Sequence, residues 1–338
     1  MTRHQPLSQT FMKTNSIPRK LALLLATAAL SLNLGCSREK PRSLRIGLAS
    51  WPGYEFLYLA QEKGFFRKEG LEVQLIEFTS ISDSRRAYER GQIDAMGATI
   101  TEVLQARDQS SRSPQVVQVV DYSNGADLIL ARPGIADCAG LRGKRVGVEL
   151  ATLGIYILAR GLEENGLSLS DVETVSMDQP SMAEALRNGT VDAIVTYSPL
   201  SVKVIRELKA ITVFSTAEIP GEVVDVIAVE AGINAQRPGE VAKLLRAFHR
   251  AIAYSHQNPA DAYRIMAARE GFTPEDFATA LTDGVKMLSE SDQAGFFGPG
   301  GKLAAVIEAS DRILRQTGQI KGPDRRGDFS NPSFVAKK

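Results

Sequence analysis

The sequence contains few of the residues that most often carry chemistry. Among its 338 residues are two cysteines, three histidines and one tryptophan. Two cysteines exclude a framework of disulfides, and so few cysteines and histidines give no clustered set of metal ligands. There is also no Ser–His–Asp order and no histidine at the end of a predicted strand. We therefore expect no catalytic residue, no metal and no cofactor, in a protein that is not an enzyme.

Long runs of basic residues are also missing. Lys and Arg number 40 and Asp and Glu 39, but four basic residues and no acidic ones fall within the first 35 residues, so the rest of the chain carries 36 basic and 39 acidic side chains, a net charge of −3. Proteins bind DNA and RNA largely through contacts of basic side chains with phosphates, and this chain has no such footprint. We exclude nucleic acid as a partner.

No apolar run is long enough to cross a membrane, because a spanning helix needs about 20 residues. The longest run, residues 21–34, has only 14 residues; it follows several basic residues and is succeeded by small ones. This order predicts a secretory signal peptide over residues 1–35, with translation starting at either Met1 or Met12.

The residues around Cys36 resemble a bacterial lipobox, since the segment 32–36 reads LNLGC. The resemblance implies that Cys36 carries lipid and holds the protein at the periplasmic face of the cell membrane. Cleavage near residues 26–28, which gives a free periplasmic protein, is the alternative. Residues 36–43 then form a polar tether. Cys138 has no partner for a disulfide, and we expect it to be a small buried residue.

What the sequence does contain is an internal repeat. The segment GQIDA at 91–95 returns 98 positions later as GTVDA at 189–193. Two pairs of strand-like segments keep nearly the same offset: 44–48 with 144–148, and 71–76 with 172–177. Each half alternates strands with helices, which predicts an α/β fold of two Rossmann-like lobes, each a parallel sheet covered by helices. Two such lobes leave a cleft between them.

Turn-forming residues in the sequence predict where each lobe begins and ends. We expect lobe I over 44–124 and 222–317, lobe II over 125–221, and a C-terminal tail over 318–338. The chain then passes between the lobes twice, forming a two-crossing hinge, once at the Asn-Gly turn 124–125. After a last strand at 223–229 we expect only helices.

Four segments resemble a known family: 50–54 (SWPGY), 60–73 (AQEKGFFRKEGLEV), 91–95 and 141–148 (LRGKRVGV). They are similar to the periplasmic substrate-binding proteins of ABC importers, in the branch that handles nitrate, sulfonates, taurine and thiamine-pyrimidine precursors. The resemblance implies a type II periplasmic-binding-protein fold with a ligand cleft between the lobes. It also implies a monomer that binds a small-molecule solute and delivers it to an ABC permease and its ATPase subunit.

Open α/β sheets bind ligands at the carboxyl ends of their strands, and both halves of the repeat offer polar residues there. Either Glu222 or Asp225 adds a carboxylate from the returning strand. The candidate ligand-binding residues are Ser50, Trp51, Tyr54, Thr79, Ser80, Ala98, Thr99, Ser123, Asn124, Glu149, Thr152, Asp178, Tyr197 and Asp225. The interpretation requires Trp51, Thr99 and Thr152 to line one cavity between two sheets.

The sequence leaves the solute open between several classes. Hydroxyl-rich helix starts suit an anion such as nitrate or a sulfonate, although the same Ser and Thr residues are ordinary helix caps. The acidic residues suit an amine. A zwitterion such as taurine satisfies both, and an aromatic heterocycle stacked on Trp51 is a further alternative. An enzyme on the same architecture, such as a chorismate dehydratase, and a sensory input to a membrane receptor are alternatives for the function.

Overall fold

The computed structural model describes residues 1–2, 42–150, 152–198, 200–297 and 300–335. The chain from Ser43 onwards forms one compact unit. None of the helices in these ranges is both long and apolar enough to cross a membrane. Apart from residues 1–2, the predicted signal peptide lies outside the described residues, as do Cys36 and most of the predicted tether.

The first of two sheets has six strands in the order β11-β4-β10-β3-β1-β2. Its strands are β1 (Leu44–Leu48), β2 (Val73–Glu77), β3 (Ala95–Thr99), β4 (Pro114–Ser123), β10 (Val224–Glu230) and β11 (Val285–Met287). β1 pairs in parallel with β2 and β3, whereas β10 runs antiparallel to β3 and β4. We call this sheet with its helices lobe I.

The second sheet has five strands in the order β7-β6-β8-β5-β9. Its strands are β5 (Asp127–Ala131), β6 (Arg145–Val148), β7 (Glu173–Ser176), β8 (Ala193–Tyr197) and β9 (Ile211–Ser215). We call it with its helices lobe II. The two sheets confirm the predicted two-lobed α/β fold. Each sheet is mixed rather than wholly parallel, because β10 in lobe I and β5 in lobe II run against their neighbours.

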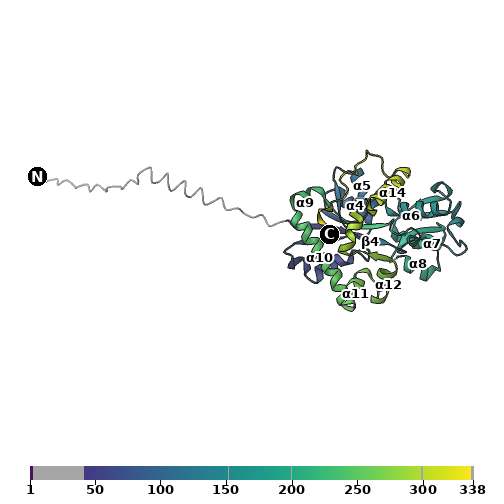
Figure 1. Ribbon diagram of the computed structural model, residues 1–338, viewed down its shortest axis with the longest axis horizontal. Helices are drawn as coiled ribbons and strands as arrows, with labels where there is room; N and C mark the ends of the chain where they lie inside the picture. The colour runs from purple at the N-terminus through teal and green to yellow at the C-terminus, as the bar shows by residue number, and fades with distance from the viewer. Residues whose placement is uncertain (3–41, 151, 199, 298–299, 336–338) are drawn as a thin grey trace. The chain divides into compact units, whose positions relative to one another are not determined.

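Helices cover both sheets, as Figure 1 shows. Lobe II carries α6 (Leu153–Glu164), α7 (Gln179–Asn188) and α8 (Leu200–Leu208). Lobe I carries α2 (Glu55–Glu62), α3 (Phe65–Lys68), α4 (Ile81–Glu89), α5 (Ile100–Gln109), α9 (Ala231–Gln236), α10 (Pro238–Gln257), α11 (Pro259–Glu270), α12 (Pro274–Asp283), α13 (Gln293–Phe297) and α14 (Lys302–Gln316). Proline occupies the first turn of α10, α11 and α12, where its missing N–H leaves no bond unmade.

The repeat seen in the sequence is also a repeat of contacts. Ile46 of β1 pairs with Ala95 of β3, and Val146 of β6 pairs with Ala193 of β8. In lobe I the Arg45 side chain binds Asp94 with Nη2 2.6 Å from Oδ1, and it also donates to the Gly91 carbonyl. In lobe II the equivalent Arg145 does the same.

Arg145 Nη2 lies 3.2 Å from Asp192 Oδ1 and donates to the Gly189 carbonyl. The backbone N–H of each arginine also bonds its aspartate. The repeated Gly and Asp of the five-residue motif therefore fasten the loop before one strand to the neighbouring strand. The motif therefore helps to hold each sheet together.

The expectation that only helices follow residue 229 is wrong. β11 adds a three-residue strand to the edge of the first sheet, where Val285 pairs with Ser123 and Met287 with Asp121. Three residues are too short to show a strand period in the sequence, and Lys286 at their centre is typical of an edge strand.

Two stretches of chain connect the lobes. The first joins β4 to β5 and the second joins β9 to β10. Thr216 ties the two stretches together, since its Oγ1 lies 2.6 Å from Ser123 Oγ and accepts a bond from the Gly125 N–H at 2.9 Å.

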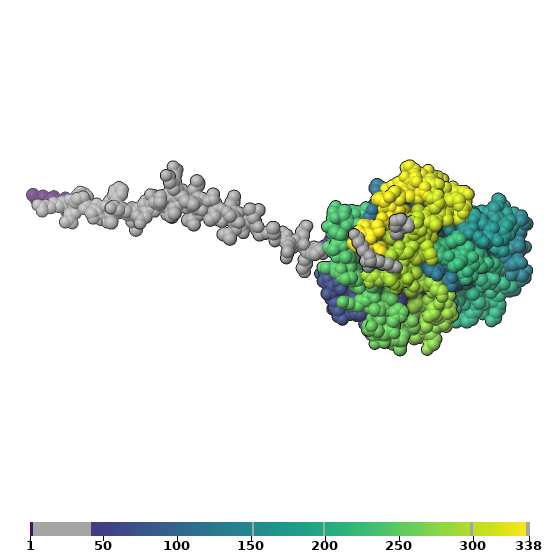
Figure 2. Space-filling model, in the orientation of Figure 1, coloured from purple at the N-terminus to yellow at the C-terminus, as the bar shows by residue number. Residues whose placement is uncertain are grey.

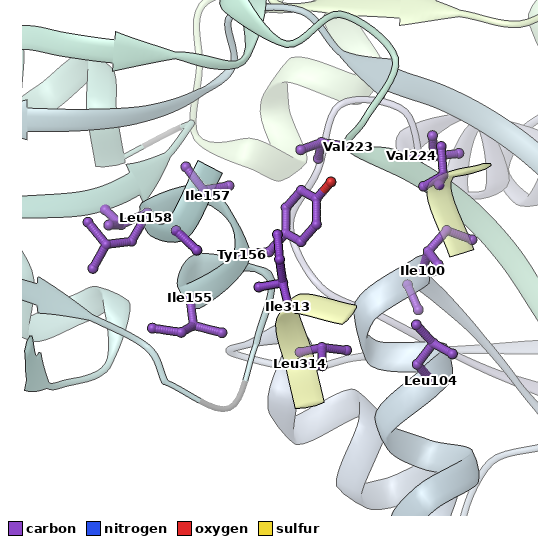
Figure 3. Close-up of a cluster of buried hydrophobic side chains, with 14 of the residues drawn as sticks. Ile100, Leu104, Ile155, Tyr156, Ile157, Leu158, Val223, Val224, Ile313 and Leu314 are labelled. Atoms are coloured by element: carbon purple, nitrogen blue, oxygen red, sulfur yellow. The ribbon is translucent and has the colours of Figure 1, made fainter. Parts of the chain in front are cut away.

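Besides these stretches, an apolar contact joins α6 of lobe II to α5 and α14 of lobe I. Figure 3 shows Tyr156 of α6 between Val223 and Ile313, with Ile100 of α5 farther along. At the surface, Arg312 of α14 lies 3.4 Å from Glu163 of α6. In Figure 2 the yellow atoms of the C-terminal segment accordingly lie beside the teal atoms of lobe II.

Candidate ligand-binding cavity

A cavity lies between the two sheets and encloses about 520 Å³ of empty space, part of it open to solvent. Residues from both lobes line it. Seven of the residues predicted from the sequence are among them: Ser50, Trp51, Tyr54, Thr99, Thr152, Tyr197 and Asp225. Trp51, Thr99 and Thr152 therefore line one cavity between two sheets, as the interpretation required.

Seven other predicted residues are not in the cavity lining. Thr79 and Asp178 are exposed, Ala98 is buried within β3, and Ser80 caps α4. The remaining three lie at the contacts between the lobes: Ser123, Asn124 and Glu149. Ser123 and Asn124 belong to the first connecting stretch, where Asn124 donates its N–H to the Gly284 carbonyl.

Of the two carboxylates weighed on the returning strand, Asp225 reaches the cavity and Glu222 does not. Glu222 instead forms a two-point pair with Arg160 of α6, with Nε–Oε2 at 2.7 Å and Nη2–Oε1 at 3.1 Å. Cys138 is fully buried and lies 3.2 Å from the Gly161 carbonyl, as expected for a packing residue.

The sequence reasoning missed several residues that line the cavity. Three are polar, Asp127, Gln179 and Thr196, and the others include Ile81, Leu153, Ile157 and Val195. Gln179 and Thr196 stand next to turns that the repeat had placed at the cleft, and the Thr196 hydroxyl donates to Gln179 Oε1 at 2.9 Å. Asp127 gave no signal, because its position depends on how the chain crosses between the lobes.

The turn after β1 brings Trp51 and Tyr54 to the cavity. Its Gly53 is required by packing, because a side chain there would collide with the carboxylate of Asp121. Asp121 in turn accepts the indole N–H of Trp51, with Nε1 3.2 Å from Oδ2. The tight Pro-Gly turn therefore fixes the orientation of the indole ring.

Aromatic rings from both lobes face each other across the cavity. Trp51 of lobe I and Tyr197 of lobe II meet edge to face, with ring centroids 6.3 Å apart and planes at 70°. Tyr54 donates its hydroxyl to Asp225 Oδ1 at 2.7 Å. Edge-to-face rings at this spacing attract one another, and they form the walls expected of a site for a flat ligand.

The helix starts predicted to hold an anion are already occupied by the protein itself. The Ser80 hydroxyl accepts from the Asp83 N–H, and Thr99 forms a capping box with Glu102. The other Glu102 oxygen, Oε1, accepts the N–H of Leu153 at 2.7 Å, so a carboxylate of lobe I caps helix α6 of lobe II. These starts serve as helix caps, the plainer of the two roles that the sequence left open.

Carboxylates dominate the electrostatics of the cavity. Burial raises the pKa of Asp121 to about 8 and that of Asp127 to about 7. Burial and the neighbouring Asp121 also raise the pKa of Asp225 well above its usual value. Asp121 and Asp225 lie opposite each other on β4 and β10, so the charge of Asp121 disfavours ionisation of Asp225.

Among the described residues that line the cavity, none is Lys, Arg or His. The described part of the chain also holds no group of three or more residues arranged to bind a metal ion. The cavity therefore presents aromatic faces and hydrogen-bond acceptors.

A family model described as NMT1/THI5 like matches residues 51–262, more than half of the sequence. The chain belongs to the NMT1/THI5-like family. The chain spans about half the length of the curated relatives that it matches from Brucella abortus, which are provisionally named binding proteins. Such a relative is 28% identical to this chain over 158 residues, and the match covers 46% of this chain and 48% of the relative.

Longer matches within and around the NMT1/THI5-like family include both binding proteins and enzymes. The chain is 24% identical over 266 residues to a formylaminopyrimidine-binding protein of Halalkalibacterium halodurans, covering 77% of this chain and 80% of that one. It is also 24% identical over 238 residues to a 4-amino-5-hydroxymethyl-2-methylpyrimidine phosphate synthase of Aspergillus parasiticus, covering 64% and 68%.

Solved structures show the same fold. The periplasmic aliphatic sulphonate binding protein SsuA of Escherichia coli superimposes with a TM-score of 0.69 at 16% identity, covering 88% of this chain and all of that one. The NMT1/THI5-like chain thus has the periplasmic-binding-protein fold that the sequence predicted.

Proposed function

We propose that the protein is the solute-binding component of an ABC importer and that it captures a small aromatic nitrogen heterocycle of the aminopyrimidine type. The observation that carries this proposal is the cavity itself. Its apolar walls combine three aromatic rings with aliphatic side chains, its polar groups are mainly hydroxyls and carboxyls, and no basic side chain lines it among the described residues. Aromatic faces suit a flat ring, and carboxyl oxygens suit its N–H groups.

The same features weigh against nitrate, a sulfonate or taurine as the solute. An oxyanion needs cationic side chains or free backbone N–H groups. The Thr99 N–H is bonded to Glu102, the Leu153 N–H to the same carboxylate, and the Gly154 N–H to the Thr152 hydroxyl. An anion would also meet Asp127 and Asp225 without a compensating charge.

Capture requires the solute to favour the closed arrangement of the lobes, and only a ligand that contacts both lobes can do this. Trp51 of lobe I and Tyr197 of lobe II both line the cavity, so a ring that packs against both side chains would contact both lobes. Micromolar affinity corresponds to about −8 kcal/mol, which a few hydrogen bonds and two aromatic contacts in a closed cleft can supply.

The proposed role in import includes the export and the lipid anchor that the sequence predicts. The leader over residues 1–35 would export the protein, and lipid on Cys36 would hold it near a permease and its ATPase subunit. The proposal treats the protein as a carrier that leaves its solute unchanged. The relationship to a pyrimidine phosphate synthase makes chemical turnover the competing outcome, so the test must measure it.

The test is a calorimetric and thermal-shift screen of the purified protein against 4-amino-5-hydroxymethyl-2-methylpyrimidine, nitrate, taurine and an alkanesulfonate. We expect the aminopyrimidine to bind with micromolar affinity, to raise the Tm and to be recovered unchanged. Binding of the sulfonate or taurine alone would overturn the heterocycle assignment. Consumption of the aminopyrimidine would overturn the carrier assignment.

A further inference from the structure

Asp127 is the one carboxyl of the cavity that has an oxygen without a partner in the described part of the protein. Its side chain is 1% exposed, yet its Oδ2 accepts no hydrogen bond. Buried polar atoms in folded proteins are nearly always bonded, so such an oxygen calls for an explanation. Asp127 lines the cavity, which places the explanation there.

Three neighbouring carboxyls are engaged, whereas Glu149 and Glu270, which lie outside the cavity lining, each keep one buried oxygen without a partner. Asp121 accepts the Trp51 indole N–H, Asp225 accepts the Tyr54 hydroxyl, and Glu102 accepts the Leu153 N–H across the lobes. Their hydrogen-bonding capacity is used to build the cavity. Asp127 differs because it is held in the same place with an oxygen left over.

The backbone fixes Asp127 beside the aromatic wall. Asp127 opens β5 and pairs in register with Tyr197 of β8. Its N–H donates to the Ser123 hydroxyl at 3.3 Å, which ties it to the first connecting stretch. A ring lying against Tyr197 would therefore bring its edge close to this carboxylate.

We propose that Oδ2 of Asp127 accepts a hydrogen bond from an amino or protonated ring nitrogen of the solute, and so selects solutes with a nitrogen donor at the ring edge. This inference rests on the proposed function, because it concerns the same cavity. A charged acceptor makes a stronger bond than a neutral one, and an unmatched carboxylate penalises a ligand that offers only acceptors. Asp127 is thereby the residue that determines specificity.

The inference is tested with Asp127→Asn, which keeps the size of the side chain and removes its charge. Asp283→Asn is the matched control, since Asp283 is exposed and lies outside the cavity lining. The probes are 4-amino-5-hydroxymethyl-2-methylpyrimidine and the same ring without its amino group. Affinities are measured by calorimetry.

We expect Asp127→Asn to bind the aminopyrimidine at least tenfold more weakly than the wild type, and Asp283→Asn to bind it equally well. The probe without the amino group should bind weakly to all three proteins and hardly distinguish them. The ligand-free Asp127→Asn variant should melt at or above the Tm of the wild type, because it no longer buries an unpaired carboxylate.

Equal binding of the aminopyrimidine by the wild type and Asp127→Asn would overturn the role of Asp127 and leave the proposed function standing. Failure of the wild type to bind either pyrimidine would instead overturn the proposed function. If Asp127→Asn does not fold, Asp127→Ser replaces it, and the preference of the wild type for the amino probe over the other still decides whether a nitrogen donor is selected.

Discussion

Trp51 combines two roles in one side chain. Its N–H is held by Asp121, and its ring forms an aromatic pair with Tyr197 of the other lobe. The ring is 6% exposed, so little of it is open to solvent. Its hydrogen bond fixes the orientation of the ring at the wall of the cavity.

Replacing Trp51 should weaken solute binding, and a replacement without a ring should weaken it more than one that keeps a ring. We expect Trp51→Ala to lower the affinity for an aminopyrimidine at least tenfold, which is about 1.4 kcal/mol, and Trp51→Phe to fall between that variant and the wild type because it keeps a ring but loses the bond to Asp121. Calorimetry measures all three. Unchanged affinity in Trp51→Ala would show that the indole only packs the lobes together.

The sequence predicted the cavity residues that directly follow strands, but not those whose position depends on how the chain connects the lobes. Trp51, Thr99 and Thr152 come directly after strands whose ends a repeat can align. Asp127 begins a strand and reaches the cavity because β5 runs antiparallel to β8. No local pattern reports the direction of a strand within its sheet, so this residue could only be found in three dimensions.

In each lobe an Arg–Asp ion pair joins neighbouring strands, and the two pairs differ in their exposure to solvent. The Arg45–Asp94 side chains are 17% and 10% exposed, whereas those of Arg145 and Asp192 are 40% and 20% exposed. Because solvent screens an exposed pair more than a buried one, the bond in lobe I should contribute more to stability.

Matched substitutions test this difference. We expect Asp94→Asn to lower the free energy of unfolding by about 2 kcal/mol and Asp192→Asn by about 1 kcal/mol or less, with solute affinity unchanged in both. Urea denaturation measures the first quantity and calorimetry the second. Equal losses would show that burial does not set the strength of these pairs, and a loss of affinity would show that the motif acts on the cavity.

Most of the helices and strands were predictable, because the residues that mark them lie within or next to each element in the sequence. Proline marked the starts of α11 and α12, and the repeat marked corresponding strands in the two sheets. The short edge strand β11 was not predicted, since three residues are too few to show a strand pattern and the pairing with β4 is a tertiary contact. The mixed direction of both sheets was missed for the same reason.

The molecule as a whole has contacts of two kinds between its lobes. Near the cavity, Ser82 donates to Glu149 at 2.8 Å and the Leu153 N–H donates to Glu102, and Trp51 contacts Tyr197 through their rings. Away from the cavity, α6 packs on α5 and α14 through apolar side chains.

The buried carboxyls also set how the stability of the whole molecule depends on pH. Burial raises the pKa of Asp127 to about 7, of Asp121 to about 8 and of Glu55 to about 9. In the unfolded chain these groups ionise near pH 4. Between about pH 4 and 9 the folded protein therefore binds more protons than the unfolded chain, and the free energy of unfolding falls as the pH rises.

We accordingly expect the ligand-free protein to lose stability from pH 5 to pH 9, with a slope on the order of 1 kcal/mol per pH unit for each group that is protonated when folded and ionised when unfolded. Urea denaturation at several pH values measures the slope. Asp127→Asn should make the fall less steep below about pH 7, because the contribution of Asp127 ends near that pH, and should leave the fall above it in place. Stability that rises over this range would mean that these carboxyls are already ionised in the ligand-free folded protein, so that burial does not set how its stability depends on pH.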